Sequence, residues 1–230
     1  MKNKIKKSKG LTNDAIAILA HQLQTPLATI RWAFESLDKE KLTSDQKEIV
    51  QAGLATSQRL VQTTESLLNL AKIEAGKLTY QFERLDVGAL LVSICDGVSL
   101  YARKHKVRIQ LPSIQRMVVR ADKEKLRLAF TNLIENAIKY NKNNGIVMIT
   151  FNDDGKKARI NISDTGIGIP KDAQKKLFTQ FFRADNVGDR EKGVGLGLYI
   201  VKRIIGEHGG SITLASEPNK GTTFHVVLPL

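Results

Sequence analysis

Apolar residues follow a heptad pattern through the first part of the chain. They recur at alternating spacings of four and three, at Ile16, Ala20, Leu23, Leu27, Ile30, Phe34 and Leu37. This spacing predicts one helix with a single apolar stripe. Polar residues at 38–44 predict a turn, and a second apolar stripe predicts another helix over about 45–75, with Gly76 as its C-terminal cap. Residues 11–76 are therefore predicted to form an all-α helical hairpin.

The apolar stripes of this hairpin are too wide for two helices to bury alone. Two copies of the hairpin can bury them as a four-helix bundle, so we predict a homodimer. A partner helix from the same chain is the competing explanation, although no later stretch has a matching heptad.

The pattern changes beyond residue 80 to alternating helices and strands. Helices are expected at 86–104, 122–140, just after Pro170 and 198–208, and strands at 107–111, 117–120, 146–151, 158–163, 211–216 and 222–228. This order predicts an α+β domain over residues 85–230, in which one mixed sheet is covered by helices on one face. Residues 77–84 are expected to be the linker.

The chain carries a net charge of +13, and residues 1–10 form a lysine-rich basic tail. That tail fits a solvated segment, a segment beside a membrane helix, or a nucleic-acid patch. Aromatic residues do not interleave with the basic ones, so no nucleic-acid partner is expected. No apolar run approaches the roughly 20 residues that cross a bilayer. The single cysteine, Cys95, fits a reducing compartment. We therefore expect a cytoplasmic protein, or the cytoplasmic part of a membrane-bound sensor.

One face of the first helix combines a histidine with an unexpected tryptophan. At 100° per residue, Thr25, Ala28 and Trp32 fall within about 40° of His21, nearly opposite the apolar stripe. An exposed tryptophan predicts a partner surface; partial packing against the neighbouring helix is the alternative. Pro26 lies one turn after His21, at a cost of about 3 kcal/mol in a helix interior. A proline in a helix interior with no evident structural benefit tends to mark a functional site.

Two glycine-rich stretches and one helix face carry further candidate chemistry. Gly193, Gly195 and Gly197 precede a predicted helix, where backbone N–H groups and the helix dipole favour phosphate; the alternative is a flexible capping loop. The run 164–169 (Asp-Thr-Gly-Ile-Gly-Ile) follows a strand. Its glycines would let a flat ring approach the backbone and its carboxylate can accept from an exocyclic amine; the alternative is an ordinary turn.

The helix at 122–140 presents several polar side chains on one side. Spacings of four, three and four place Asn132, Asn136, Lys139 and Tyr140 together. An amide oxygen can ligate Mg²⁺ alongside phosphate oxygens, a lysine can neutralise phosphate, and a tyrosine can cover a base. Asparagine is a poor helix former, so two on one face need a reason.

Together these motifs resemble the sensor histidine kinases of two-component signalling. Residues 21–27 look like the H box, 132–140 like the N box, 164–169 like the G1 box, 177–183 like the F box and 193–198 like the G2 box. The resemblance implies a dimerisation and phosphotransfer hairpin followed by an ATP-binding domain of the fold shared with gyrase-type and chaperone ATPases. It implies ATP and Mg²⁺ as cofactors, a homodimer, and a response regulator as partner.

The resemblance also assigns roles to individual positions. His21 would accept the phosphoryl group and pass it to a regulator aspartate, Arg183 would approach the γ-phosphate, and Thr25 would help dephosphorylate the regulator, which would dock near Ala28 and Trp32. Asn136 would bind Mg²⁺. The implied nucleotide contacts are Asn132, Asn136, Lys139, Tyr140, Asp164, Gly166, Gly168, Arg190, Gly193, Gly195, Leu196, Gly197 and Thr222. Residues 184–192 would form a mobile lid over ATP.

Gln22 departs from the family pattern. An acidic residue usually follows the histidine and can take the imidazole Nδ1 proton; a glutamine accepts a hydrogen bond from that N–H but cannot take its proton. General-base help is typically worth about 10²–10⁴-fold. We therefore expect slower autophosphorylation of His21. The alternative is an ATP-binding signalling module that is weak as a kinase and dominated by phosphatase activity. An ATPase acting on nucleic acid, suggested only by the charge, is a third possibility.

Overall fold

The computed structural model describes residues 20, 22–111, 116–184 and 194–230. The chain divides into two compact units, Met1–Thr79 and Tyr80–Leu230, here called the hairpin unit and the sheet unit. The boundary between them falls within residues 77–84, the stretch that the sequence predicts as a linker. None of the helices in the described part of the chain is long and apolar enough to span a bilayer.

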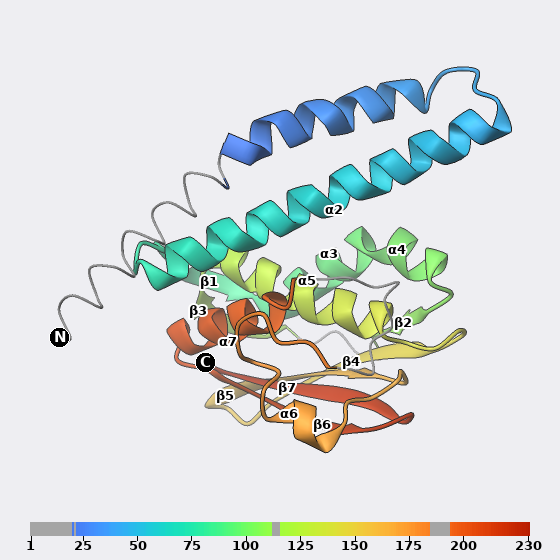
Figure 1. The fold of residues 1–230 in the computed structure, drawn as a ribbon. Coiled ribbons are helices and arrows are strands. Elements are labelled where there is room, and N and C mark those ends of the chain that lie inside the picture. Colours follow the sequence, from blue (N-terminus) through green and yellow to red (C-terminus); the bar gives the residue numbers. More distant parts are fainter. Residues whose placement is uncertain (1–19, 21, 112–115, 185–193) are drawn as a thin grey trace. The chain divides into compact units, whose positions relative to one another are not determined.

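The hairpin unit consists of a helix over residues 22–37 and α2 (Ser44–Glu74), which run antiparallel (Figure 1). Thr43 begins α2 with a capping box: its hydroxyl accepts from the backbone N–H of Gln46 at 3.3 Å, and the Gln46 side chain accepts from the N–H of Thr43 at 3.0 Å. After α2, Gly76 adopts a φ of 64°, the left-handed conformation that favours glycine. The predicted helical hairpin is confirmed.

The apolar stripe of the hairpin is only partly covered within one chain. The ring of Phe34 lies against Gly53, where a β-carbon would overlap it. Other members of the stripe remain between 45% and 69% exposed: Leu23, Ile30, Leu37, Ile49 and Leu60. Uncovered apolar surface of this extent is typical of a protein interface.

The sheet unit alternates helices and strands as predicted. Its elements are β1 (Glu83–Asp86), α3 (Val87–Gly97), α4 (Ser99–Lys104), β2 (Arg108–Gln110), β3 (Val118–Ala121), α5 (Lys123–Lys139), β4 (Ile146–Asp153), β5 (Lys157–Asp164), α6 (Lys171–Gln174), α7 (Gly197–Glu207), β6 (Ser211–Glu217) and β7 (Gly221–Pro229). Asp122 caps α5 by accepting from the N–H of Lys125 at 2.9 Å, at the predicted start of that helix.

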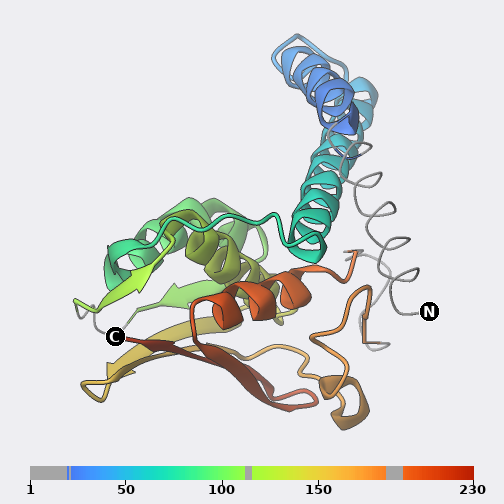
Figure 2. The same ribbon diagram turned by 90° about the vertical axis from the view of Figure 1, so that its left-hand side faces the viewer.

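Five strands form one mixed sheet in the order β2-β4-β5-β7-β6, with β2 parallel to β4 and the other pairs antiparallel. Figure 2 shows α3, α5 and α7 over one face of this sheet. Alternate residues of the central strands are buried beneath them, among them Ile160 and Ile162 on β5 and Phe224 and Val226 on β7. The predicted α+β architecture is confirmed.

Two features of the sheet unit differ from the prediction. The single helix expected at 86–104 is two helices, α3 and α4, which are separated at Val98. Gly97, a poor helix former, ends the first of them. Strand β1 lies partly in the predicted linker and pairs with β3 in a separate two-stranded sheet. Its four residues include one buried side chain, Leu85, so no alternation marks it in the sequence.

Candidate functional site

Asp164 is the last residue of β5, and one of its two carboxylate oxygens accepts hydrogen bonds from the backbone. Its Oδ1 accepts from the backbone N–H of Gly166 at 2.8 Å and from that of Thr222 at 3.2 Å. Oδ2 has no donor among the described residues. Burial raises the pKa of Asp164 to about 6, and the two N–H bonds limit the rise. The carboxylate is thus ionised at neutral pH and offers a free acceptor.

The glycines after Asp164 are required by close backbone packing. A β-carbon at Gly166 would overlap the carbonyl oxygen of Tyr140, and one at Gly168 would overlap that of Glu217. Gly168 also has a φ of 64°. These glycines let the loop fit between the end of α5 and the β6–β7 turn, a reason that the sequence did not reveal. The approach of a flat ring stays a prediction.

A hydrogen-bond network that sequence reasoning missed joins this loop to the end of α5. The Thr165 hydroxyl donates to Oδ1 of Asn141 at 3.1 Å and accepts from the N–H of Ile146 at 3.0 Å. The Asn141 amide donates to the carbonyls of Ala137 and Ile146, each at 3.1 Å. Asn141 directly follows the 132–140 motif, and that position was the one available signal.

Polar residues of α5 face the start of α7. The Asn132 amide donates to the carbonyl of Leu128 at 2.9 Å, and its Oδ1 would lie 2.7 Å from a β-carbon on Gly197. Asn136 is half-buried, and its side chain has no hydrogen-bond partner among the described residues. Lys139 places its Nζ 5.3 Å from the centre of the Tyr140 ring. The structure thus brings Asn132 to the start of α7 at Gly197, and the carbonyl of Tyr140 to Gly166 in the 164–169 run.

The residues before α7 also meet the 177–183 segment. A β-carbon on Gly195 would lie 2.8 Å from the carbonyl oxygen of Phe182, and Gly195 has a φ of 76°. Phe181, with a φ of 60°, is exposed, as is Arg183. The Leu196 side chain is buried in the core, so a ligand can meet this residue only through its backbone. No side chain caps the described start of α7.

Thr222 stands beside Asp164 on the neighbouring strand and bonds to a residue absent from the prediction. Its Oγ1 lies 2.9 Å from Oγ of Ser216, while its N–H binds Asp164. Gln174 donates from its amide to the carbonyls of Ile169 at 2.8 Å and Ser216 at 2.9 Å. Sequence reasoning missed both Ser216 and Gln174, because their partners lie on separate elements.

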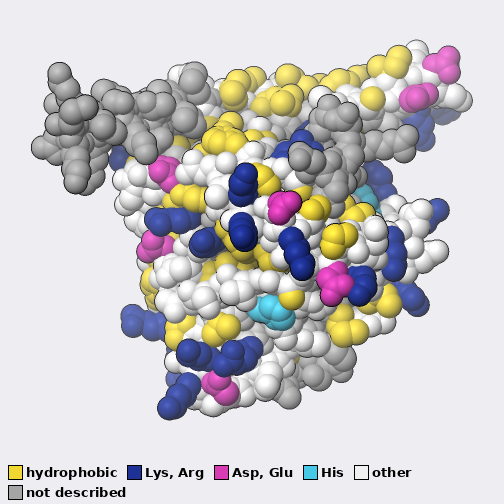
Figure 3. All heavy atoms as spheres, turned by 60° about the horizontal axis from the view of Figure 1, so that its bottom comes forward, with side chains coloured by type: hydrophobic (Ala, Val, Ile, Leu, Met, Phe, Trp, Pro, Cys, Tyr) yellow, Lys and Arg dark blue, Asp and Glu magenta, His cyan; other side chains and the backbone are white. Residues whose placement is uncertain are grey.

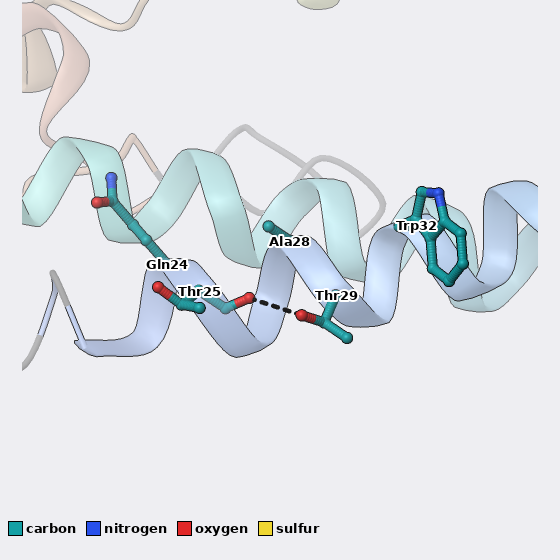
Figure 4. A pocket seen from close by; sticks show the side chains of 5 residues that line it. All are labelled: Gln24, Thr25, Ala28, Thr29 and Trp32. Atoms are coloured by element: carbon teal, nitrogen blue, oxygen red, sulfur yellow. Dashed lines mark hydrogen bonds between the residues drawn. The ribbon is translucent and has the colours of Figure 1, made fainter.

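The first helix carries an open hollow of about 500 Å³, lined by Gln24, Thr25, Ala28, Thr29 and Trp32. Figure 4 shows these side chains along one helix, with the Thr29 hydroxyl donating to the carbonyl of Thr25 at 3.2 Å. Trp32 is 68% exposed, which favours a surface position over packing against the neighbouring helix. The predicted shared face is confirmed for the described residues.

Two family models match the chain. The His Kinase A (phospho-acceptor) domain matches residues 12–76, and the histidine kinase-, DNA gyrase B-, and HSP90-like ATPase matches residues 121–230. The chain belongs to the sensor histidine kinase family. The first match includes His21, and the second spans the whole run from Asn132 to Thr222.

Two relatives of this kinase core are longer proteins. The circadian input-output histidine kinase CikA of Synechococcus elongatus is 32% identical over 228 residues, which cover 94% of this chain and 30% of CikA. Sensor protein SrrB of Staphylococcus aureus is 33% identical over 222 residues, which cover 95% of this chain and 38% of SrrB. The chain thus spans about a third of the length of these relatives.

Solved histidine kinase structures have the same fold. Full-length ShkA in complex with AMPPNP matches with a TM-score of 0.75 and 27% identity, over 94% of this chain and 45% of ShkA. The catalytic domain of histidine kinase ThkA matches with a TM-score of 0.55 and 28% identity, over 65% of this chain and 95% of that domain.

The structure brings some of the histidine kinase boxes together and leaves parts of others outside the described residues. The N, G1 and F boxes and the described part of the G2 box lie in the sheet unit, joined by the contacts above. Three predicted site residues, His21, Arg190 and Gly193, lie outside the described residues. Gln22 is described and exposed on the first helix.

Proposed function

We propose that this chain binds Mg²⁺–ATP in its sheet unit, transfers the γ-phosphoryl group to His21, and passes it on to an aspartate of a response regulator. The observation that carries the proposal is Asp164: an ionised, largely buried carboxylate beside close-packed glycines, with one oxygen to which no described residue donates. A buried carboxylate left with an open acceptor is costly unless a ligand donates to it.

ATP is the nucleotide that this carboxylate suits. The exocyclic amine of adenine donates to Oδ2 of Asp164, Thr222 touches the adenine side, and the solved ShkA structure holds the ATP analogue AMPPNP. No described side chain caps the N-terminus of α7, which directs its N–H groups at phosphate. The other proposed nucleotide contacts are Asn132, Lys139, Tyr140, Gly166, Gly168, Arg190, Gly193, Gly195, Leu196 and Gly197, with Arg183 at the γ-phosphate.

Asn136 is the proposed protein ligand for Mg²⁺. The described residues contain no cluster of three or more His, Cys, Asp or Glu side chains that could hold a metal. Mg²⁺ commonly keeps waters and binds through few protein oxygens plus substrate phosphates. The half-buried amide of Asn136, which has no hydrogen-bond partner in the part of the chain that the structure describes, fits that donor set. When bound, the ion neutralises charge on the phosphates.

Phosphoryl transfer then depends on the imidazole of His21. A bond forms between its Nε2 and the γ-phosphorus, the bond from that phosphorus to the bridging oxygen breaks, and ADP leaves. An unperturbed histidine has a pKa near 6.5 and is mostly neutral at pH 7, so attack is available. Gln22 accepts a hydrogen bond from the Nδ1–H, and water removes the proton.

The hairpin unit supplies the proposed partner surfaces. The half-exposed apolar stripe is covered by a second copy in a four-helix bundle, giving a homodimer. The regulator docks over Ala28 and Trp32, in the hollow of Figure 4, and Thr25 positions water when the regulator is dephosphorylated. We place the protein in the cytoplasm, alone or as the cytoplasmic part of a membrane-bound sensor.

The second candidate is a module weak as a kinase and dominated by phosphatase activity, which Gln22 favours. The third, an ATPase acting on nucleic acid, is suggested only by the net charge, and the phospho-acceptor hairpin at residues 12–76 argues against it. On the face in Figure 3, Lys and Arg side chains are scattered rather than gathered into a single stripe.

Incubation with γ-labelled ATP and Mg²⁺ separates these candidates. Acid-labile, base-stable label that disappears in His21→Gln, and is strongly reduced in Asp164→Asn, supports the kinase. ATP binding without label supports the second candidate, and hydrolysis stimulated by DNA supports the third. Failure of the wild-type protein to bind ATP overturns the proposal.

A further inference from the structure

Three polar side chains form a row across adjacent strands beside the proposed adenine site. Ser216 on β6 pairs in register with Thr222 on β7, so both side chains point to the same face. Thr222 lies two and four residues from the buried Phe224 and Val226 on β7, and so shares their face of the sheet. Asp164 has the same relation to Ile162 and Ile160 on β5. All three members of the row therefore lie on the face that the helices cover.

The hydrogen positions along this row follow from counting donors at Ser216. Its Oγ lies 2.9 Å from the N–H of Ile169, 2.9 Å from the carbonyl of Gly221 and 2.9 Å from Oγ1 of Thr222. The serine hydroxyl has one hydrogen and two lone pairs. The N–H of Ile169 donates to it, and the Gly221 carbonyl can only accept. Ser216 thus donates to Gly221, and Thr222 must donate to Ser216.

This arrangement leaves Thr222 without a hydrogen to offer a ligand. The reverse orientation, with Ser216 donating to Thr222, would deprive the carbonyl of the buried Gly221 of that donor, a loss of about 1–3 kcal/mol for a buried group. Next to Thr222, Oδ2 of Asp164 also presents lone pairs only, as no described residue donates to it. The end of the pocket thus contains two acceptors.

We infer that Ser216 is a positioning residue that fixes the Thr222 hydroxyl as an acceptor, so that the site takes a 6-aminopurine and rejects a 6-oxopurine. The inference rests on the proposed nucleotide site and deepens it. The amine of adenine has two hydrogens, which suit two acceptors. The carbonyl of hypoxanthine or guanine places a third oxygen against them where adenine has its amine, a mismatch that sites of this kind reject strongly.

Gln174 provides a control within the same loop. Its amide binds the carbonyls of Ile169 and Ser216, so it holds the same segments together. Unlike Ser216, it takes no part in the hydrogen chain that ends at Thr222. Loss of Gln174 loosens the pocket without freeing the threonine hydrogen.

The experiment measures dissociation constants for ADP and inosine diphosphate, which differ in the purine at the 6-position, by titration calorimetry on the full chain. Wild type is expected to prefer ADP by about 100-fold or more. In Ser216→Ala the freed Thr222 hydroxyl donates to the 6-oxo group, and the preference falls about tenfold, mainly through tighter inosine diphosphate binding. Ser216→Thr keeps the preference, and Gln174→Ala weakens both ligands equally.

Three results would overturn the inference. They are an unchanged preference for ADP in Ser216→Ala, a fall in that preference in Gln174→Ala as large as in Ser216→Ala, and the same fall when Ser216→Ala is made in a Thr222→Val background. If Ser216→Ala does not fold, Ser216→Cys, a weaker acceptor, must show an intermediate preference. A wild-type protein that binds neither nucleotide refutes the proposed function itself. One that binds ADP with a preference insensitive to Ser216 refutes this inference alone.

Discussion

Gly168 and Glu217 lie so close that a β-carbon on the glycine would overlap the carbonyl oxygen of the glutamate. This contact joins the G1 loop to the β6–β7 turn, and the N–H of Asn219 reinforces it by donating to the carbonyl of Ile167 at 2.7 Å. The geometry of the nucleotide site therefore depends on a backbone approach that only glycine permits.

Gly168→Ala is expected to lower the free energy of unfolding by at least about 3 kcal/mol, because strain at positive φ adds to a clash with fixed backbone. Gly155→Ala is the matched control: Gly155 has a φ of 77°, but nothing lies within 4 Å of its β-carbon position. That variant should lose about 1–2 kcal/mol. Urea unfolding followed by circular dichroism compares them, and equal losses would contradict the role of the contact.

His208 is a second fixed point of the sheet unit. The backbone N–H of Asp122 donates to its Nε2 at 3.0 Å, so Nδ1 carries the hydrogen and donates to the carbonyl of Ile204 at 2.8 Å. The ring is buried against Tyr80 and Phe82, whose centres lie 5.6 and 5.1 Å from its own. The histidine thus joins the capping residue of α5 to the end of α7.

His208→Phe keeps an aromatic ring but leaves the N–H of Asp122 unpaired. We expect it to lower the free energy of unfolding by about 1–3 kcal/mol. His105→Phe is the control, because that ring contacts Tyr101 at 4.4 Å and no described backbone N–H donates to it. Thermal and urea unfolding should place His208→Phe clearly below His105→Phe; the reverse order would show that ring packing, not the hydrogen bond, matters.

Asp164 should make nucleotide binding sensitive to pH. Burial raises the pKa of its carboxyl to about 6 in the free protein, and only the ionised form leaves Oδ2 as a pure acceptor for the adenine amine. Affinity for ADP is therefore expected to fall as the pH drops from 7 to 5, by up to about tenfold per unit below the pKa. The same titrations on Asp164→Asn show how much of the pH dependence comes from protonation of the ADP phosphates. An identical pH profile in both proteins would exclude Asp164 as the cause.

The same pKa shift has a consequence for stability. Between the ordinary value of 3.8 and about 6, the folded protein binds this proton more than the unfolded chain does. The ionised carboxyl therefore lowers the free energy of unfolding most above pH 6, and this penalty shrinks as the pH falls toward 4. Asp164→Asn should raise the free energy of unfolding at pH 7 and much less at pH 4, while it lowers the affinity for ADP.

The sequence predicted those parts of the fold that depend on local pattern. The heptads of the hairpin, the caps at Asp122 and Gly76 and the hairpin strands β4 and β5 all carry their signals within a few residues. The bonds of Ser216 and Gln174 carry no such signal, because their partners lie on separate elements. Asn141 is marked only by its place directly after the 132–140 motif. The glycines at 166 and 168 were singled out for the approach of a ring, and the backbone that they also approach is visible only in three dimensions.

Gln22 offers a direct test of the proposed chemistry at His21. Gln22→Glu provides a carboxylate that takes the Nδ1 proton during attack, so autophosphorylation should accelerate, by up to about 10²-fold if proton removal limits the rate. Gln24→Glu adds the same charge two residues along the exposed helix and should have little effect. Single-turnover labelling at saturating ATP measures both; an unchanged rate in Gln22→Glu would show that the glutamine does not limit transfer.

Trp32 tests whether the hollow on the first helix receives the regulator. A tryptophan that is 68% exposed contributes little to the fold, yet a buried tryptophan anchor commonly contributes 2 kcal/mol or more to an interface. Trp32→Ala should therefore leave the labelling rate of His21 unchanged and slow transfer to the receiver domain at least about tenfold at subsaturating regulator. Leu100→Ala, which trims a leucine that is 75% exposed on the sheet unit, is the control and should alter neither step. Quench-flow transfer assays with purified phosphorylated protein separate the two rates, and equal transfer in wild type and Trp32→Ala would move the docking surface elsewhere.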